Sequence, residues 1–354
     1  MPLERRQLLP GQGDSLIGRL FSFPLHRLHL LALVFLLYSL AAGFKIAATG
    51  SITSFFGFGC RPDICFAGLN GATLPGHTVV YSSGGYDGQF YYYLAAEMGG
   101  AGPALLDAPA FRRARIGFVY LTFWLYRAGP EALSLGMPIF LFLSHLLLVY
   151  WNSERQVDLM SAALALNPVS LLSFLLVLPD GLALQLALLA FQGLARAADW
   201  PGQIFFTGLL SFSLLVKETM LAFPMALGSA ALIHFLVSGQ NRKAQLRLMT
   251  LAILSALPLA LWWSWVGFTP GQAASRGSWP FSGVIEYFSN APSRSQYVLL
   301  FLLIAGLYRL GIMAQSLEWR AAPGFLVLLF SLGLASFASA DEYWANFANI
   351  ARLF

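Results

Sequence analysis

The sequence predicts an all-α, polytopic integral membrane protein. Of its 354 residues, 58% are hydrophobic and only 10% are charged, whereas a soluble domain carries about 25% charged residues. Apolar runs of roughly 17–25 residues recur from residue 29 to residue 338, each long enough to cross a hydrocarbon core about 30 Å thick. We therefore expect about nine transmembrane helices, with interfacial or re-entrant helices in a long first external loop.

Hydropathy divides the chain into parts that are expected to lie differently relative to the membrane. They are a cytoplasmic N-terminus at 1–28, a first span at 29–48, an external loop at 49–131, a bundle of spans at 132–338 and an external tail at 339–354. Within the bundle the predicted spans are 132–151, 158–178, 180–196, 202–217, 219–238, 246–267, 297–314 and 321–338.

The basic residues predict the orientation of these spans. Arg242, Lys243 and Arg247 lie between the sixth and seventh spans, and the positive-inside rule places them in the cytoplasm together with the N-terminus. These two positions agree only if a single span connects the long external loop to the loop at 152–157. The run Ile116–Arg127 is therefore expected to be a re-entrant or interfacial helix, since its length of about 12 residues is too short to cross.

With this orientation, nearly every unusual ionisable group lies on the external side of the membrane. The arrangement predicts chemistry at the outer membrane surface and argues against a cytosolic nucleotide sugar as the direct substrate. The net charge of +5 comes from basic residues at span ends without a continuous patch, so nucleic-acid binding is not expected. No nucleotide-binding glycine loop, zinc motif or nucleophile elbow is present in the sequence.

The stretch Gly84–Glu97, GGYDGQFYYYLAAE, sets one carboxylate, Asp87, among four tyrosines and a phenylalanine. If the stretch is helical, Tyr86 and Phe90 fall on one face and Asp87 pairs with Tyr91 on a neighbouring face. We therefore expect a helix that lies on an apolar boundary and has its carboxylate at the start.

Two interpretations of Asp87 remain open. In the first, it is a general base or an orienting carboxylate that activates an acceptor hydroxyl. In the second, it is a helix N-cap, for which Asp is among the preferred residues. Gly88 and Gln89 follow it directly and leave room for a ligand in either case.

Three arginines, Arg112, Arg113 and Arg115, lie on the side of the membrane where positive charge is normally sparse. Arg112 and Arg115 have the i, i+3 spacing that can hold one phosphate or diphosphate group. The alternative is an interfacial helix anchored to anionic lipid. Asp107 is a candidate salt-bridge partner for these arginines.

Further ionisable residues lie at the ends of predicted spans. Asp180 follows Pro179 at an external turn, where capping of the next helix is the favoured interpretation. Lys217 and Glu218 form an ionisable pair that is costly at membrane depth unless it is paired or functional. A local ion pair or snorkelling is the alternative to a functional role.

Both cysteines, Cys60 and Cys65, lie in the long external loop. A disulfide is the favoured interpretation if this loop faces an oxidising compartment, and two free thiols are the alternative. A zinc site is not expected, because His77 is the nearest further soft ligand and four ligands are usual.

Two motifs carry a resemblance to a known family. At Tyr86–Ala95 the sequence resembles bacterial membrane proteins with a Y-D-G-Q-F-Y-Y-x-L-A motif, which look like members of the GT-C glycosyltransferase superfamily. These proteins are distantly similar to the second mannosyltransferase of GPI-anchor assembly. Asp107–Ile116, DAPAFRRARI, resembles the D-x-P-x-[YF]-R-x-x-R-I stretch of the same group, and Asn167–Pro168, Pro179–Gly181 and Val216–Thr219 fall where similar motifs recur.

The resemblance implies an inverting, polyprenyl-phosphate-sugar-dependent hexosyltransferase of the bacterial inner membrane, with its active face outside. It would transfer mannose or another hexose to a cell-surface glycan, lipid or protein. Asp87 would be the catalytic carboxylate, and the three arginines would bind the carrier phosphate. The candidate substrate-binding residues are Tyr86, Gln89, Tyr91, Arg112, Arg113, Arg115, Asp180, Lys217 and Glu218.

The resemblance also bears on cofactors and partners. The second acidic residue that usually stands close to the first in this superfamily is absent here, so no cofactor is expected and a divalent metal ion is the less favoured alternative. The expected partners are the lipid-linked sugar donor and membrane lipids. A catalytically silent GT-C-like scaffold subunit, bound to other membrane proteins, is the second functional hypothesis. A transporter or lipid flippase is disfavoured, because the polar residues collect at span ends rather than inside the spans.

Overall fold

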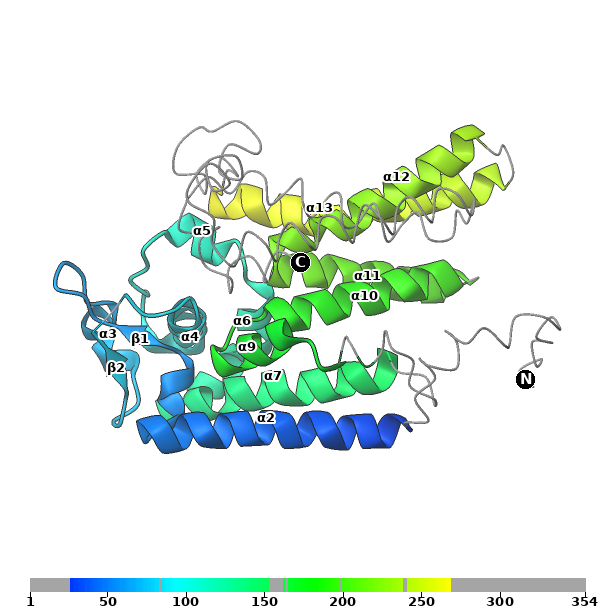
Figure 1. The fold of residues 1–354 in the computed structure, drawn as a ribbon. Helices are drawn as coiled ribbons and strands as arrows, with labels where there is room; N and C mark the ends of the chain where they lie inside the picture. The colour runs from blue at the N-terminus through cyan, green and yellow to red at the C-terminus, as the bar shows by residue number, and fades with distance from the viewer. Residues whose placement is uncertain are drawn as a thin grey trace, which may run out of the picture.

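The computed structural model describes residues 26–82, 84–152, 162, 165–197, 199–237 and 241–268. In these residues the chain is mostly helical and has two parts (Figure 1). Long helices lie side by side in a bundle, and the segment 50–129 forms a cap over one end of it. The bundle consists of α2 (Arg27–Thr49), α7 (Pro130–Asn152), α9 (Pro168–Leu175), α10 (Asp180–Arg196), α11 (Trp200–Val216), α12 (Ala222–Val237) and α13 (Arg242–Val266).

Four stretches of the described chain are long and apolar enough to cross a membrane. They are α2, Pro130–Trp151 of α7, Glu218–Leu236 and α13. In α2 only Leu30, Val34 and Tyr38 are buried, at the i, i+4 spacing of one helix face, while large apolar side chains on the other faces are exposed. Exposed apolar surface of this extent is stable in contact with lipid, so the structure indicates a multi-pass membrane protein.

The structure differs from the predicted spans in the middle of the chain. In the described part of the predicted span 158–178, the helix is interrupted at Leu166–Asn167, where Asn167–Pro168 was expected to kink it, and α9 begins at Pro168. Val177 then adopts a φ of 48° in the turn before α10. The helices α10 and α11 are apolar but have only 17 residues each, close to the lower limit of about 17 for a span. The predicted spans 297–314 and 321–338 lie outside the described residues, so nine spans are not shown.

The cap is built from short elements around a two-stranded parallel sheet. In this sheet Phe58 pairs with Val80 and Gly59 with Tyr81. The elements are η1 (Ile52–Phe55), β1 (Phe58–Gly59), α3 (Phe66–Leu69), η2 (Gly71–Thr73), β2 (Val80–Tyr81), α4 (Gly88–Ala96), η3 (Glu97–Ala101), α5 (Pro109–Arg113), α6 (Gly117–Thr122) and η4 (Phe123–Ala128). The predicted re-entrant helix at 116–127 is thus divided into α6 and η4, neither of which can cross a bilayer.

The direction of the helices sets which chain segments meet below the cap. Figure 1 shows that α2 and α13 begin at the far end of the bundle and run toward the cap. The antiparallel order of α10 and α11 then brings the start of α10, the end of α11 and the short helix η5 (Glu218–Leu221) to the cap end. Charged residues at these three helix ends therefore meet those of the cap.

Candidate functional site

The helix α4 lies in the middle of the cap and has no exposed face. All nine of its residues are buried. Phe56 and Phe58 pack edge-to-face on Tyr92, with ring centroids 5.1 and 5.2 Å away, while Phe66 packs on Phe90 at 5.3 Å. The prediction that this helix lies on an apolar boundary is therefore wrong, because aromatic side chains of the cap pack around α4 and bury it inside the protein.

Backbone contacts of glycines fix where α4 begins. Gly85 has a φ of 73°, and a Cβ atom at this position would collide with the carbonyl oxygen of Gly57. A Cβ atom on Gly88 would likewise collide with the carbonyl oxygen of Leu176 in the bundle. Asp87, which directly precedes Gly88, is thereby held at the boundary between cap and bundle.

Gln89 stabilises this entry to the helix rather than facing open space. Its side chain is fully buried, accepts a hydrogen bond from the Gly59 N–H at 3.1 Å and donates to the Gly84 carbonyl at 3.0 Å. Both polar ends of the amide are thus used by the cap backbone. We assign Gln89 to positioning the Gly84–Asp87 loop.

Asp87 occupies the N-cap position of α4, but its side chain makes no capping hydrogen bond. Its Oδ1 atom lies 3.0 Å from Nη1 of Arg112, and 28% of the side chain is exposed. The capping interpretation therefore does not account for this carboxylate. Asp87 is thus a partly exposed carboxylate with a cationic partner.

Arg112 connects Asp87 to a second carboxylate, Asp107. The Nε and Nη2 atoms of Arg112 each donate a 2.8 Å hydrogen bond to Asp107, and its guanidinium lies 4.2 Å from the ring centroid of Phe90. Burial alone would lower the pKa of Arg112, but the hydrogen bond to Asp107 and the charges of Asp87 and Asp107 outweigh it and raise the pKa. This arginine therefore stays charged.

The other two arginines have different partners. Arg113 forms a pair with Glu97, whose oxygens lie 2.9 and 3.0 Å from its Nη2. Arg115 donates from Nε to Glu218 Oε2 at 2.8 Å, and its Nη2 contacts the second oxygen. Burial opposes the charge of Arg115, but Glu218 raises its pKa well above the ordinary value. The expected joint phosphate site of Arg112 and Arg115 is thus occupied by carboxylates.

Lys217 and Asp180 form the most deeply buried ion pair of the described residues. Their Nζ and Oδ1 atoms are 2.8 Å apart, and only 5% and 4% of the side chains are exposed. Asp180 is the first residue inside α10, whose N-cap position is taken by Pro179. The favoured interpretation of Asp180 as a helix cap is therefore wrong, because its carboxylate neutralises Lys217 instead.

Tyr91 lies among these charges with its hydroxyl group buried, and among the described residues this hydroxyl has no hydrogen-bond partner. Burial raises the pKa of Tyr91, and the charges of Arg115, Asp180 and Asp87 all act on its hydroxyl. The structure thus gathers residues from the cap and from three helix ends into what we name the charged cluster. The charged cluster consists of Asp87, Tyr91, Asp107, Arg112, Arg115, Asp180, Lys217 and Glu218.

Two other groups of predicted site residues lie apart from the charged cluster. Tyr86 is exposed and packs edge-to-face on Tyr81 with centroids 6.3 Å apart. Cys60 and Cys65 form a disulfide, which closes a short loop next to β1. In the part of the chain that the structure describes, no group of three or more His, Cys, Asp or Glu side chains is arranged to hold a metal ion.

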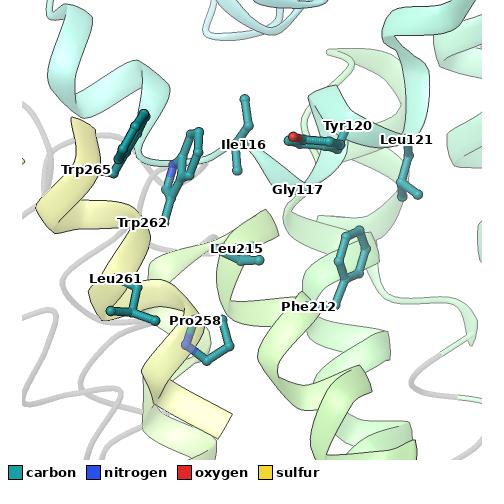
Figure 2. Close-up of a pocket in the computed structure, with 10 residues that line it drawn as sticks. All are labelled: Ile116, Gly117, Tyr120, Leu121, Phe212, Leu215, Pro258, Leu261, Trp262 and Trp265. Carbon is teal, nitrogen blue, oxygen red and sulfur yellow. The ribbon is translucent and has the colours of Figure 1, made fainter.

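An apolar groove of about 600 Å³ lies beside the charged cluster. Figure 2 shows side chains of α6, α11 and α13 converging on it from three sides. The groove is lined by Ile116, Gly117, Tyr120, Leu121, Phe212, Leu215, Pro258, Leu261, Trp262 and Trp265.

The groove and the charged cluster are continuous along the chain. Ile116 directly follows Arg115, and Leu215 precedes Lys217 by two residues. The indole of Trp262 donates a 2.8 Å hydrogen bond to the carbonyl of Arg113, which attaches α13 to α5 at this point. The sequence did not indicate this groove, because the three helices that form it are distant in sequence.

Comparisons with known proteins give no further assignment. No protein-family model matches the chain, and no curated protein and no solved structure was found to match it.

Proposed function

We propose that this chain is a GT-C-type glycosyltransferase, which transfers a hexose from a polyprenyl-phosphate carrier to a cell-surface acceptor. The observation that carries the proposal is the ion pair of Asp87 and Arg112, in which a partly exposed carboxylate and a guanidinium share one edge of a buried cluster. Sugar transfer from a phosphate needs these two groups: a base for the acceptor hydroxyl and a cation for the departing phosphate.

In the proposed reaction, Asp87 takes the proton of the acceptor hydroxyl while the hydroxyl oxygen attacks the anomeric carbon. The bond from the anomeric carbon to the phosphate oxygen breaks on the opposite face of the sugar, so the configuration inverts. The electron pair of that bond leaves with the polyprenyl phosphate, whose added charge is stabilised by Arg112. The proton on Asp87 is then lost to water.

The apolar groove supports a lipid-linked donor over a soluble one. Its lining residues Ile116 and Leu215 are close in sequence to Arg115 and Lys217 of the charged cluster, so the proposal assigns the hydrocarbon chain of a donor with its phosphate at the cluster to the groove. Its lining is aromatic and aliphatic, and α13 is one of the helices that can cross the membrane. A prenyl chain there would stay in contact with apolar surface along its length.

The proposal puts the cap on the external face of a bacterial inner membrane. The disulfide in the cap is typical of an oxidising compartment. The basic residues Arg242 and Lys243 begin α13 at the opposite end of the bundle, as the positive-inside rule requires for a cytoplasmic end (Figure 1).

Replacing Asp87 by asparagine tests the proposal directly. The amide keeps the size of the side chain but cannot take a proton, so we expect turnover of a polyprenyl-phosphate sugar to fall by about 100-fold or more. Donor consumption by purified protein in micelles measures this, and thermal unfolding confirms that the variant is folded. Glu97→Gln, which removes a carboxylate next to Arg113 instead, is the matched control and should retain turnover. Equal turnover by Asp87→Asn and the wild type would refute a catalytic role of Asp87.

Filling the groove tests the lipid part of the proposal. Leu261 lines the groove and is exposed, so Leu261→Trp should narrow it with little effect on folding. We expect the KM for a long-chain polyprenyl-phosphate donor to rise about tenfold, equivalent to some 1.4 kcal/mol of lost apolar contact, while a short prenyl donor is little affected. The comparison of both donors measures this. An equal rise in KM for both donors would mean that the prenyl chain binds outside the groove.

One observation favours a second candidate function, the catalytically silent scaffold. Both arginines of the charged cluster, Arg112 and Arg115, already have carboxylate partners, which suffices to explain the cluster as part of the folded structure. A wild-type protein that neither binds nor consumes any polyprenyl-phosphate sugar, but copurifies with another membrane protein, would support this candidate.

A further inference from the structure

The two carboxylates on Arg112 differ in how they hold it. Asp107 takes two of its donors in a bidentate pair, whereas Asp87 contacts a third nitrogen. The Asp107 side chain is 38% exposed and the Arg112 side chain 12%. Asp107 is therefore the partner that solvent, or a ligand from solvent, can reach and displace.

A bidentate carboxylate uses the same donors of an arginine that a phosphate uses. Two oxygens of either group accept parallel hydrogen bonds from one edge of the guanidinium. Asp107 thus occupies the position on Arg112 that the phosphate of a ligand would require. Arg115 offers no such position, because its partner Glu218 is held with it in the buried part of the charged cluster.

We infer that Arg112 is the phosphate-binding residue of this protein, and that Asp107 fills its anion position until a phosphate displaces it. The identification of that phosphate with the head group of a lipid-linked donor rests on the proposed function. The displacement itself requires only a phosphate oxyanion and the three residues Asp87, Asp107 and Arg112.

The guanidinium of Arg112 keeps an anionic partner at every stage of the exchange. Arg112 keeps Asp87 as a partner when Asp107 leaves, and the phosphate takes over the two donors that Asp107 releases. Asp107 can turn away into solvent, where a carboxylate is well hydrated. The bound phosphate would then share one guanidinium with Asp87, which keeps the base close to the sugar that the phosphate carries.

Competition by Asp107 has a measurable consequence. Since a phosphate must displace the carboxylate before it binds, removing the charge of Asp107 should tighten phosphate binding. Asp107→Asn keeps the side-chain size and the oxygen that accepts from the Ala108 N–H at 2.7 Å. We expect the Kd for a phosphate ligand to fall about tenfold in this variant, as for the loss of one charge-assisted competitor.

The experiment measures binding of farnesyl phosphate and of inorganic phosphate to the full-length protein in detergent by calorimetry. Asp107→Asn is compared with the wild type, with Glu97→Gln, which removes the partner of Arg113, and with Asp107→Asn/Arg112→Gln. We expect the gain in Asp107→Asn alone, and its loss in the double variant. A gain with farnesyl phosphate only assigns a lipid head group as the ligand, whereas a gain with both probes assigns phosphate from either source.

The inference is overturned if Asp107→Asn, folded by thermal unfolding, binds neither probe more tightly than the wild type, or if the gain survives the loss of Arg112. These results are separable from the test of the proposed function. If Asp107→Asn binds phosphate more tightly but the wild type transfers no sugar, the exchange on Arg112 is supported and the glycosyltransferase function is rejected. Sugar transfer that depends on Asp87, together with phosphate binding that Asp107→Asn does not change, would support the enzyme and reject the exchange.

Discussion

Asp180→Leu is expected to lower the free energy of unfolding by about 3–5 kcal/mol, because it leaves the ammonium group of Lys217 buried without its carboxylate. The two side chains are almost completely buried, and their charged atoms are 2.8 Å apart. Removing the charge of Lys217 as well should recover most of the lost free energy of unfolding. We therefore expect Asp180→Leu/Lys217→Met to be more stable than Asp180→Leu, since the double variant buries no charge at this position.

The measurement is a double-mutant cycle by thermal or denaturant unfolding in a fixed detergent. Asp199 provides the control, because it also lies at the N-terminal end of a bundle helix but is exposed and caps α11, accepting a hydrogen bond from Gly202 N at 3.0 Å. Asp199→Ala should cost about 1 kcal/mol, the ordinary value of an N-cap. If Asp180→Leu costs no more than Asp199→Ala, or if the double variant is no more stable than the single one, the ion pair does not stabilise the junction of cap and bundle as described.

The parts of the fold that the sequence predicts best are those that a long apolar run determines alone. The predicted spans 29–48 and 132–151 differ from α2 and α7 by at most two residues at either end. The described part of the predicted span 158–178 is interrupted where the sequence marks a break, because Asn167 lies outside a helix and Pro168 begins α9. The turn that follows Leu175 is not marked in this way. The residues from Leu171 to Leu178 are apolar apart from Ser173, so nothing in their hydropathy indicates that the helix ends and Val177 turns.

The charged residues of the candidate site were predicted better than their contacts. Asp87, Arg115 and Lys217 are conspicuous because charge is rare in this chain and falls at helix ends. Their pairing depends on tertiary structure, since Arg115 and Glu218 are 103 residues apart. The burial of α4 was missed for a similar reason. Periodicity describes one helix by itself, whereas the aromatic side chains that enclose α4 come from separate segments of the cap.

Gly85→Ala is expected to destabilise the protein by about 3 kcal/mol, the sum of two costs. An L-residue with a φ of 73° costs about 1–2 kcal/mol. A further cost of about 1–3 kcal/mol arises because the new methyl group meets the Gly57 carbonyl, while Gln89 Nε2 lies only 2.7 Å away. Since neither neighbour can move without breaking the entry to α4, we also expect Asp87 to shift and sugar transfer to fall at least about tenfold.

Gly50→Ala separates these two costs. Gly50 ends α2 with a φ of 76°, nearly that of Gly85, but no atom of the part of the chain that the structure describes lies within 4 Å of the position that a Cβ atom would take. Its substitution should therefore cost only the conformational part, about 1 kcal/mol, and leave transfer unchanged. Unfolding and donor consumption of both variants measure the difference. Equal losses of stability would mean that backbone conformation alone is responsible, and the close approach of the Gly84–Asp87 loop to Gly57 would then not position the catalytic carboxylate.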